Sequence, residues 1–280
     1  MSKQAMPLVL YIMTSMVSDS KILIYAQKPI CTITISNTIK EYNGVNVVIA
    51  VLSYSGYNQE DSLLFNKSSI DRGLFSSIKY EVVEIIENKF MNEALVYISD
   101  GDILRDNDGK IVLKSFVSGR VDKVTKHTSI ERKKIVRVRI FLYRFFIVRD
   151  KFTSRHSQKG VIKAILSHED LPFIKDGIAP HLIINPHAIL SRMTMGHLLE
   201  MIMCKIYVLD SNNARDLMLP SKPKSRESSC IDATAFKKAY RSFEADMAKL
   251  SKEKIYCGAT GLPIEARVAT GICYYHAVVM

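Results

Sequence analysis

The order of hydrophobic and polar residues predicts a chain built mainly from strands. The run from Val45 to Leu52 is almost entirely apolar and rich in β-branched residues, and it follows the turn pair Asn43-Gly44, a combination typical of a buried strand. Turn-forming residues at 100–102 and 106–109 divide the middle of the chain, which is expected to contain strands only. The strand-like segments there are Ile78 to Ile86, Ala94 to Ile98, Lys110 to Phe116 and Lys134 to Val148.

Apolar residues recur at helical spacing in two later segments. The first follows Ser191 and Thr194 and includes Met195, Leu198, Leu199, Ile202, Met203 and Ile206. The second follows Asp232 and includes Phe236, Tyr240, Phe243, Met247 and Leu250. Between them, the stretch from Pro220 to Ser229 has the composition of a loop. These patterns predict a β-rich α+β fold whose strand-only middle section has the character of an inserted subdomain.

The positive charge of the chain is concentrated in one stretch. The formal net charge of +11 indicates either a polyanionic partner or a basic protein without one. Between Arg120 and Lys163, fourteen lysines and arginines stand against three acidic residues, an excess equal to that of the whole chain. A stripe of this kind suits a surface that follows phosphate groups. The aromatic residues within it are expected to pack inward; they are Phe141, Tyr143, Phe145, Phe146 and Phe152.

Composition narrows the class of protein further. With 280 residues, of which 48% are hydrophobic, the chain can form one large domain or two modest ones. The five cysteines contain no C-x-x-C pair, so we expect no zinc site and a reducing, intracellular environment. Neither a membrane span nor a signal peptide is evident, which predicts a soluble protein without membrane contact. Nucleus, cytoplasm, nucleoid and virion all remain open as locations.

The segment Gly56 to Ser62 follows the first predicted strand and carries the acidic pair Glu60 and Asp61. Carboxylates at the end of a rigid element can serve a metal ion. An adjacent acidic pair can equally cap the next turn, and in isolation the capping role is the more common one.

Two basic segments suit phosphate binding. Lys151 to Gly160 gathers three cations and a histidine among small polar residues, with a terminal glycine that lets backbone approach a phosphate closely. Asn185 to Thr194 leads into the first predicted helix, where free backbone amides and Arg192 together would form an anion site. A solvated basic loop and an ordinary surface arginine are the alternatives. His187, beside a proline, is expected to be a structural hydrogen-bonding residue.

Taken in order, these segments resemble the second-largest subunit of multisubunit DNA-directed RNA polymerases, the β or B-type subunit. The resemblance covers most of the chain except residues 78–147 and 210–255. The matching segments are Lys3 to Met6, Ser55 to Ser62, Ser68 to Phe75, Asp150 to Gly160, Glu169 to Phe173, Gly177-Ile178 and Leu182 to Glu200.

The resemblance implies a hybrid-binding domain that contains a double-psi β-barrel, in two parts at 1–77 and 148–280. Residues 78–147 would correspond to a short inserted flap or wall. The implied function is to hold the RNA 3′ end, the RNA–DNA hybrid and the incoming nucleoside triphosphate during template-directed RNA synthesis. The implied partners are the largest subunit, other polymerase subunits, DNA template, RNA and nucleoside triphosphates.

The resemblance also implies residue roles. Lys151, Lys159 and Arg192 would be catalytic, with Arg192 on the triphosphate and the lysines on RNA, and Glu60 and Asp61 would meet a second Mg²⁺ that arrives with the nucleotide. Gln4, Arg155 and His156 would join Lys151 and Lys159 in nucleic-acid binding. The family's principal Mg²⁺ is held by three aspartates of the largest subunit, in an Asn-Ala-Asp-Phe-Asp-Gly-Asp segment that this chain lacks. Asp100-Gly101-Asp102 is expected to be a turn.

The chain departs from the family pattern at several positions. The family usually reads Gly-Asp-Lys-Phe-Ala-Ser-Arg-His-Gly-Gln-Lys-Gly, whereas Arg149, Thr153 and Ser157 stand here for a glycine, an alanine and a glycine. After Tyr274-Tyr275 the family's basic residues and histidine are missing, and His276 is out of register with that histidine. We therefore expect a fragment, a split gene or a truncated reading frame, from a viral or otherwise divergent source. The competing functions are a non-catalytic nucleic-acid-binding module and a subunit-docking fragment.

Overall fold

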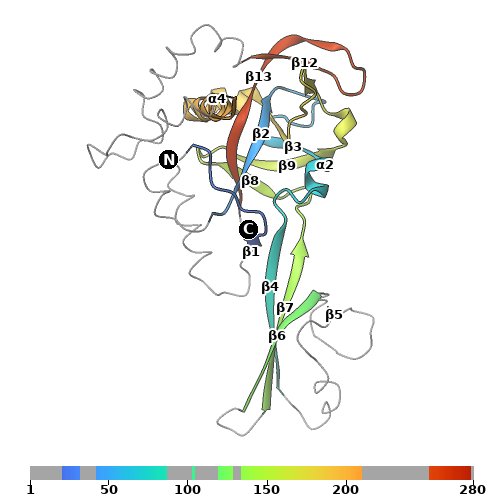
Figure 1. The fold of residues 1–280 in the computed structure, drawn as a ribbon, viewed down its shortest axis with the longest axis vertical. Coiled ribbons are helices and arrows are strands. Elements are labelled where there is room, and N and C mark those ends of the chain that lie inside the picture. The colour runs from blue at the N-terminus through green and yellow to red at the C-terminus, as the bar shows by residue number, and fades with distance from the viewer. Residues whose placement is uncertain are drawn as a thin grey trace, which may run out of the picture. The chain divides into compact units, whose positions relative to one another are not determined.

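The computed structural model describes residues 21–31, 42–86, 103–104, 119–128, 134–209 and 252–278, which fall into two compact units (Figure 1). We call one the barrel unit; its described residues are 25–31, 42–75, 146–209 and 252–278. The other, which we call the ribbon unit, comprises 21–24, 76–86, 103–104, 119–128 and 134–145. Outside the described residues lie Gln4, the predicted strands at 94–98 and 110–116, the predicted turns, and the predicted loop and helix between 220 and 250.

The barrel unit is a ring of six strands. They are β2 (Val45–Val51), β3 (Ser62–Asn66), β8 (Lys151–Ser154), β9 (Lys159–Leu166), β11 (Leu182–Ile184) and β13 (Pro263–Val278). The hydrogen-bonded order is β13, β2, β11, β3, β9, β8, and β8 then pairs with β13 again. Two neighbouring pairs are parallel, β2 with β11 and β3 with β9, and the rest are antiparallel. Closure leaves no free edge in the ring.

Shorter elements surround the ring. β12 (Glu253–Tyr256) pairs with β13 and β10 (Phe173–Ile174) pairs with β12, which extends the sheet beside the barrel. The helical elements are α2 (Lys67–Asp71), the 3₁₀ turn η3 (His168–Asp170), α3 (Pro186–Arg192) and α4 (Met195–Leu209). Figure 1 shows α4 beside β13. A Cβ on Gly271 of β13 would lie 2.6 Å from the carbonyl oxygen of Met201, so the glycine permits this close approach.

The core of the barrel unit is formed by apolar side chains from its strands. Val47, Ile49 and Ala50 of β2 are fully buried, which confirms the prediction of a buried strand from Val45. Four phenylalanines pack against one another with ring centroids 4.7 to 6.3 Å apart: Phe65, Phe75, Phe146 and Phe152. Aromatic pairs at such distances add to the stabilisation from burial. The predicted inward packing of Phe146 and Phe152 is thus confirmed.

The ribbon unit is a five-stranded antiparallel sheet. Its order is β1 (Lys21–Leu23), β4 (Ser77–Ile86), β7 (Lys134–Arg144), β6 (Gly119–Thr128) and β5 (Ile103–Leu104). Val121, Val138 and Ile140 are its buried apolar residues among those described. Tyr143 is 66% and Phe145 54% exposed, so the prediction that they pack inward is wrong. The predicted strand to Val148 is too long, because β7 ends at Arg144.

Among the described residues, no helix combines the length and apolar character that crossing a membrane requires.

Candidate phosphate-binding site

One hollow in the barrel unit gathers charged side chains from three separate segments of the chain. Glu60 and Asp61 approach from the turn before β3, Lys159 from the start of β9, beside Gln158, and Arg192 from α3. Four of these residues were predicted from the sequence as site residues: Glu60, Asp61, Lys159 and Arg192. Gln158 was assigned no role. The structure therefore brings four of the eight predicted site residues to one place.

Arg192 reaches the hollow from the last turn of α3. Asn185 caps this helix by accepting a hydrogen bond from the backbone N–H of His187 at 2.8 Å, and Pro186 occupies the first helical position. The helix ends at Arg192, and the residue that caps it, Met193, has a left-handed φ of +50°. The expectation that Arg192 stands at the start of the long helix is wrong, because it lies at the end of a separate short helix that precedes α4. His187 makes the structural hydrogen bond expected of it.

The guanidinium of Arg192 has two polar partners. Nη1 donates to Oε1 of Gln158 at 2.9 Å, and Nη2 donates to Oδ2 of Asp61 at 2.5 Å. The hydrogen bond to Asp61 raises the pKa of Arg192 further above neutral, so the group is permanently cationic. A phosphate could compete with the carboxylate of Asp61 for this guanidinium.

Glu60 and Asp61 form part of a tight turn between β2 and β3. Glu60 has a left-handed φ of +51°, and the N–H of Ser62 donates to the carbonyl of Gln59. The side chain of Asn58 stabilises the loop before this turn: its Oδ1 accepts from the N–H of Tyr54 at 3.0 Å and its Nδ2 donates to the carbonyl of Leu52 at 2.6 Å. Glu60 and Asp61 are exposed, and the carboxylate of Asp61 accepts from Arg192.

Lys151 and Lys159 lie on the same face of the β8–β9 hairpin. Lys151 is directly opposite Val161, and Thr153 is directly opposite Lys159. Directly opposed residues project to the same face, and so do alternate residues along a strand. Lys151 and Lys159 therefore share one face. Neither Lys151 nor Lys159 has an ion-pair partner among the residues that the structure describes.

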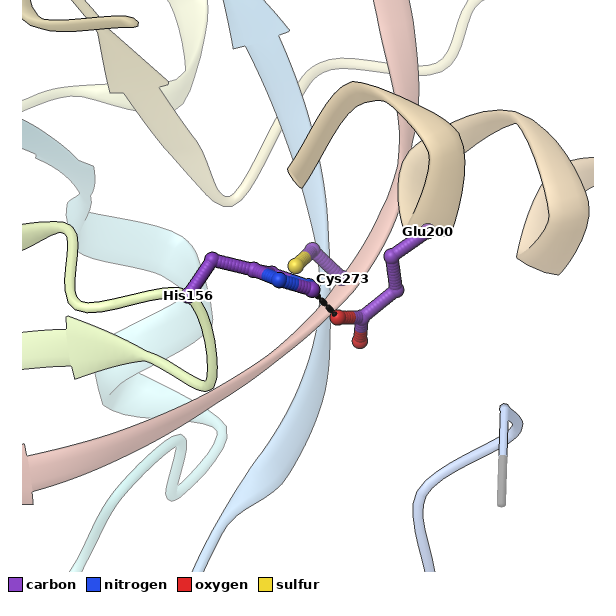
Figure 2. A group of neighbouring side chains, drawn as sticks. All are labelled: His156, Glu200 and Cys273. Atoms are coloured by element: carbon purple, nitrogen blue, oxygen red, sulfur yellow. Dashed lines mark hydrogen bonds and ion pairs between the residues drawn. The ribbon is translucent and has the colours of Figure 1, made fainter. Parts of the chain in front are cut away.

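Arg155 and His156 turn into the interior instead. Nη2 of Arg155 donates to Oε1 of Glu200 at 2.6 Å and its Nη1 donates to the carbonyl of Cys31 at 2.7 Å. Nε2 of His156 bonds to the other oxygen of Glu200, as Figure 2 shows. Gly196 leaves room for the histidine, since a Cβ there would lie 2.9 Å from Nδ1 of His156. We call Arg155, His156 and Glu200 the interior clamp.

Glu200 is the centre of the interior clamp and carries its charge while fully buried. Burial alone would raise the pKa of Glu200, but Arg155 and His156 outweigh it and hold the pKa at about 2. Its Oε1 also accepts from the backbone N–H of Tyr274 at 3.0 Å. One carboxylate from α4 thus connects the loop between β8 and β9 to β13.

The ligand atoms of His156, Glu200 and Cys273 lie within 4.8 Å of one another, which is close enough to consider a metal centre (Figure 2). Both oxygens of Glu200 are already engaged, and the cationic Arg155 is one of the partners. Burial also raises the pKa of Cys273, which disfavours the thiolate that a metal needs. We interpret the group as a charge-balanced structural network.

Comparison with known proteins identifies the family. The family model for RNA polymerase Rpb2, domain 6, matches residues 1–103 and 95–278. The chain belongs to this family of the second-largest RNA polymerase subunit. The DNA-directed RNA polymerase II subunit RPB2 of Meyerozyma guilliermondii is 33% identical over 98% of this chain and 26% of its own length. A probable RPB2 homologue of Invertebrate iridescent virus 3 is 32% identical over 92% of the chain and 26% of its length.

An archaeal relative extends the match. The DNA-directed RNA polymerase subunit Rpo2 of Sulfolobus acidocaldarius is 29% identical over 83% of the chain and 24% of its own length. The chain therefore spans about a quarter of the length of the curated relatives that it matches.

Two positions where the resemblance implies glycine have left-handed backbone in this chain. Arg149 has a φ of +85° and Ser157 a φ of +62°. Left-handed backbone costs glycine little and other residues more. Both residues therefore adopt a backbone conformation that favours glycine.

Sequence reasoning assigned no role to Gln158 and Glu200, although both lie in segments that resemble the Rpb2 family. Glu200 could have been noticed as a charged residue within the apolar face of a helix, next to the buried Met201. Gln158 carries no such signal, because a glutamine in a polar loop is ordinary.

Proposed function

We propose that this chain supplies the part of an RNA polymerase active centre that holds phosphate groups, and that it acts in complex with a largest subunit. The observation that carries the proposal is the convergence of Glu60, Asp61, Lys159 and Arg192 on one hollow from three segments. A docking fragment has no physical need for this arrangement. A non-catalytic nucleic-acid-binding module would need the lysines but not the acidic pair.

Within this proposal, the six-stranded ring is the double-psi β-barrel of the hybrid-binding domain. Its closure and its two parallel pairs support that interpretation, because a simple up-and-down barrel would be antiparallel throughout. The ribbon unit is the counterpart of the flap or wall. Its strands carry many of the basic residues between Arg120 and Lys163.

The proposed role of Lys151 and Lys159 is to bind phosphates near the RNA 3′ end. The two ammonium groups lie on one face of a hairpin, and neither is neutralised by a described acidic residue. A lysine acts as a compact point charge, which suits a backbone phosphate that shifts by one nucleotide after each addition. Fixed cations of this kind offset negative charge that accumulates in the transition state.

The proposed role of Arg192 is to bind the triphosphate of the incoming nucleotide. A guanidinium presents a planar fork that can engage two phosphate oxygens at once. The carboxylate oxygens of Glu60 and Asp61 are ligands that Mg²⁺ accepts, and they are exposed beside Arg192, so they fit an ion that arrives with the nucleotide. That ion would neutralise phosphate charge, while the principal Mg²⁺ would be held by the largest subunit.

Arg155 and His156 have a different proposed role. Their side chains are committed to Glu200, so we assign them to positioning the loop between Lys151 and Lys159. Any contact they make with nucleic acid would come through the backbone of that loop. Gln4 remains a proposed contact to the hybrid.

The experiment is RNA primer extension on a DNA template by a polymerase reconstituted with this chain, the remaining parts of the second-largest subunit and a largest subunit. We expect Mg²⁺-dependent extension that falls about 100-fold in the Lys151→Ala, Lys159→Ala double variant. Lys254→Ala, an exposed lysine of β12, is the matched control. Equal rates for the double variant and the control would show that the lysines do not act at the site.

A further inference from the structure

The two partners of Arg192 differ in how firmly they are held. Gln158 accepts from Nη1 at 2.9 Å and is buried, whereas Asp61 accepts from Nη2 and its side chain is 49% exposed. The guanidinium therefore has one edge against the protein interior and one edge towards solvent.

Gln158 has no freedom to turn away. Its Nε2 donates to the carbonyl of Ala188 at 3.0 Å and also to Oγ1 of Thr194. Both N–H groups of the amide are thus used, which leaves Oε1 directed at Arg192. The loop before β9 and the two ends of α3 are joined through this single side chain, and the guanidinium is oriented by it.

Asp61 is held by its backbone alone. Its carbonyl accepts from the N–H of Val161 at 2.9 Å, which anchors the main chain to β9. Its carboxylate contacts Arg192 at the surface, where water screens the attraction and an ion pair contributes little. The side chain can rotate away without disturbing the strand.

Asp61 and a phosphate would compete for the same edge of Arg192. The carboxylate of Asp61 already accepts a hydrogen bond from Nη2 on that edge, and both side chains line the hollow. A phosphate oxygen can take this hydrogen bond only in place of the carboxylate.

We propose that Asp61 occupies the triphosphate's place on Arg192 when no nucleotide is bound, and that Gln158 is a positioning residue that keeps the guanidinium aimed. The proposal rests on the proposed function. When a triphosphate arrives with Mg²⁺, it displaces the carboxylate, and the freed carboxylate turns to the metal ion. Arg192 thereby has one fixed partner and one exchangeable partner.

The test measures binding of inorganic tripolyphosphate to the full chain by calorimetry, first with EDTA and then with saturating Mg²⁺. Without metal, we expect Asp61→Asn to bind about two- to five-fold more tightly than the wild type, because the competitor is removed. With Mg²⁺ the advantage disappears or reverses, since the carboxylate is then needed at the metal. Gln158→Ala weakens binding under both conditions.

Glu265→Gln, an exposed acid of β13, controls for the change in net charge. If it tightens binding as much as Asp61→Asn does, or if Asp61→Asn binds no more tightly than the wild type, the exchange is refuted. Arg192→Ala separates this outcome from failure of the proposed function. If Arg192→Ala binds tripolyphosphate more weakly, the proposed role of Arg192 in binding the triphosphate stands, even when the exchange with Asp61 is refuted. If its binding is unchanged, both the proposed role and the exchange are refuted.

Discussion

The described residues of the barrel unit include two arginine–carboxylate pairs of the same chemistry in opposite surroundings. Arg155 and Glu200 are joined at 2.6 Å with 14% and 1% of their side chains exposed. Arg192 and Asp61 are joined at 2.5 Å with 36% and 49% exposed. The distances are nearly equal, so only the surroundings separate the pairs.

The difference shows that contact geometry alone does not reveal what an ion pair does. A buried pair that loses one member leaves an uncompensated charge in a medium that solvates it poorly. An exposed pair loses little, because water replaces the missing partner. The first arrangement suits a permanent connection between elements, and the second suits a contact that a ligand can replace.

The largest expected effect comes from removing the buried carboxylate. We predict that Glu200→Ala lowers the free energy of unfolding by about 3–5 kcal/mol. Asp61→Ala, the matched truncation at the exposed pair, should lower it by about 1 kcal/mol at most. Urea denaturation of the full chain, followed by circular dichroism, measures both. If the two losses were equal, the distinction between a fixed and an exchangeable pair would be wrong.

The pH dependence of the free energy of unfolding provides the control for this prediction. The pKa of Glu200 is about 2 in the folded chain against 4.5 for the free side chain, so its contribution is complete above pH 4.5 and is lost as the pH falls towards 2. Glu200→Gln, which keeps the shape, should lose this dependence below pH 4.5. Burial lowers the pKa of His197 and His276 to about 4, which adds a loss between pH 6.5 and 4 in both proteins. An unchanged acid profile in Glu200→Gln would contradict the interior clamp.

A smaller effect is expected around the hairpin that carries the lysines. Arg149→Gly and Ser157→Gly should each raise the free energy of unfolding by up to about 1 kcal/mol, because relief of left-handed strain exceeds the entropy cost of glycine. Thr153→Gly, at a regularly paired position of β8, should instead destabilise the chain. Thermal unfolding compares the three. Destabilisation by all of them would mean that the two positive-φ residues are not strained.

The fold was predictable where local pattern and burial agree. The β-branched run from Val45 became β2, and the helical spacing from Met195 became α4. Helix α3 was missed although Asn185 and Pro186 are a typical helix start, because the segment was treated as the approach to the next helix. Tyr143 and Phe145 were placed inside because an aromatic residue in a strand does not reveal which face is covered.

Some residues around the hollow could be selected from the sequence, but the pairing of the charged side chains could not. Residues 60, 61, 159 and 192 were selected from the sequence, and they lie around one hollow. The pairing of Arg155 with Glu200, 45 positions apart, has no local signature. An arginine in a basic loop is expected to face solvent and bind phosphate. Only the fold shows that the charge of Arg155 is balanced by the buried Glu200.

The most direct test of the proposed role of Arg192 is the kcat/KM for the incoming nucleotide in the reconstituted polymerase, compared between wild type and Arg192→Lys. Lysine keeps the charge but loses the two-pronged hydrogen bond, so we predict a fall of about ten-fold or more. Arg267→Lys, at an exposed position of β13, should leave kcat/KM unchanged. A value for Arg192→Lys equal to that of Arg267→Lys would contradict the claim that this chain binds the triphosphate.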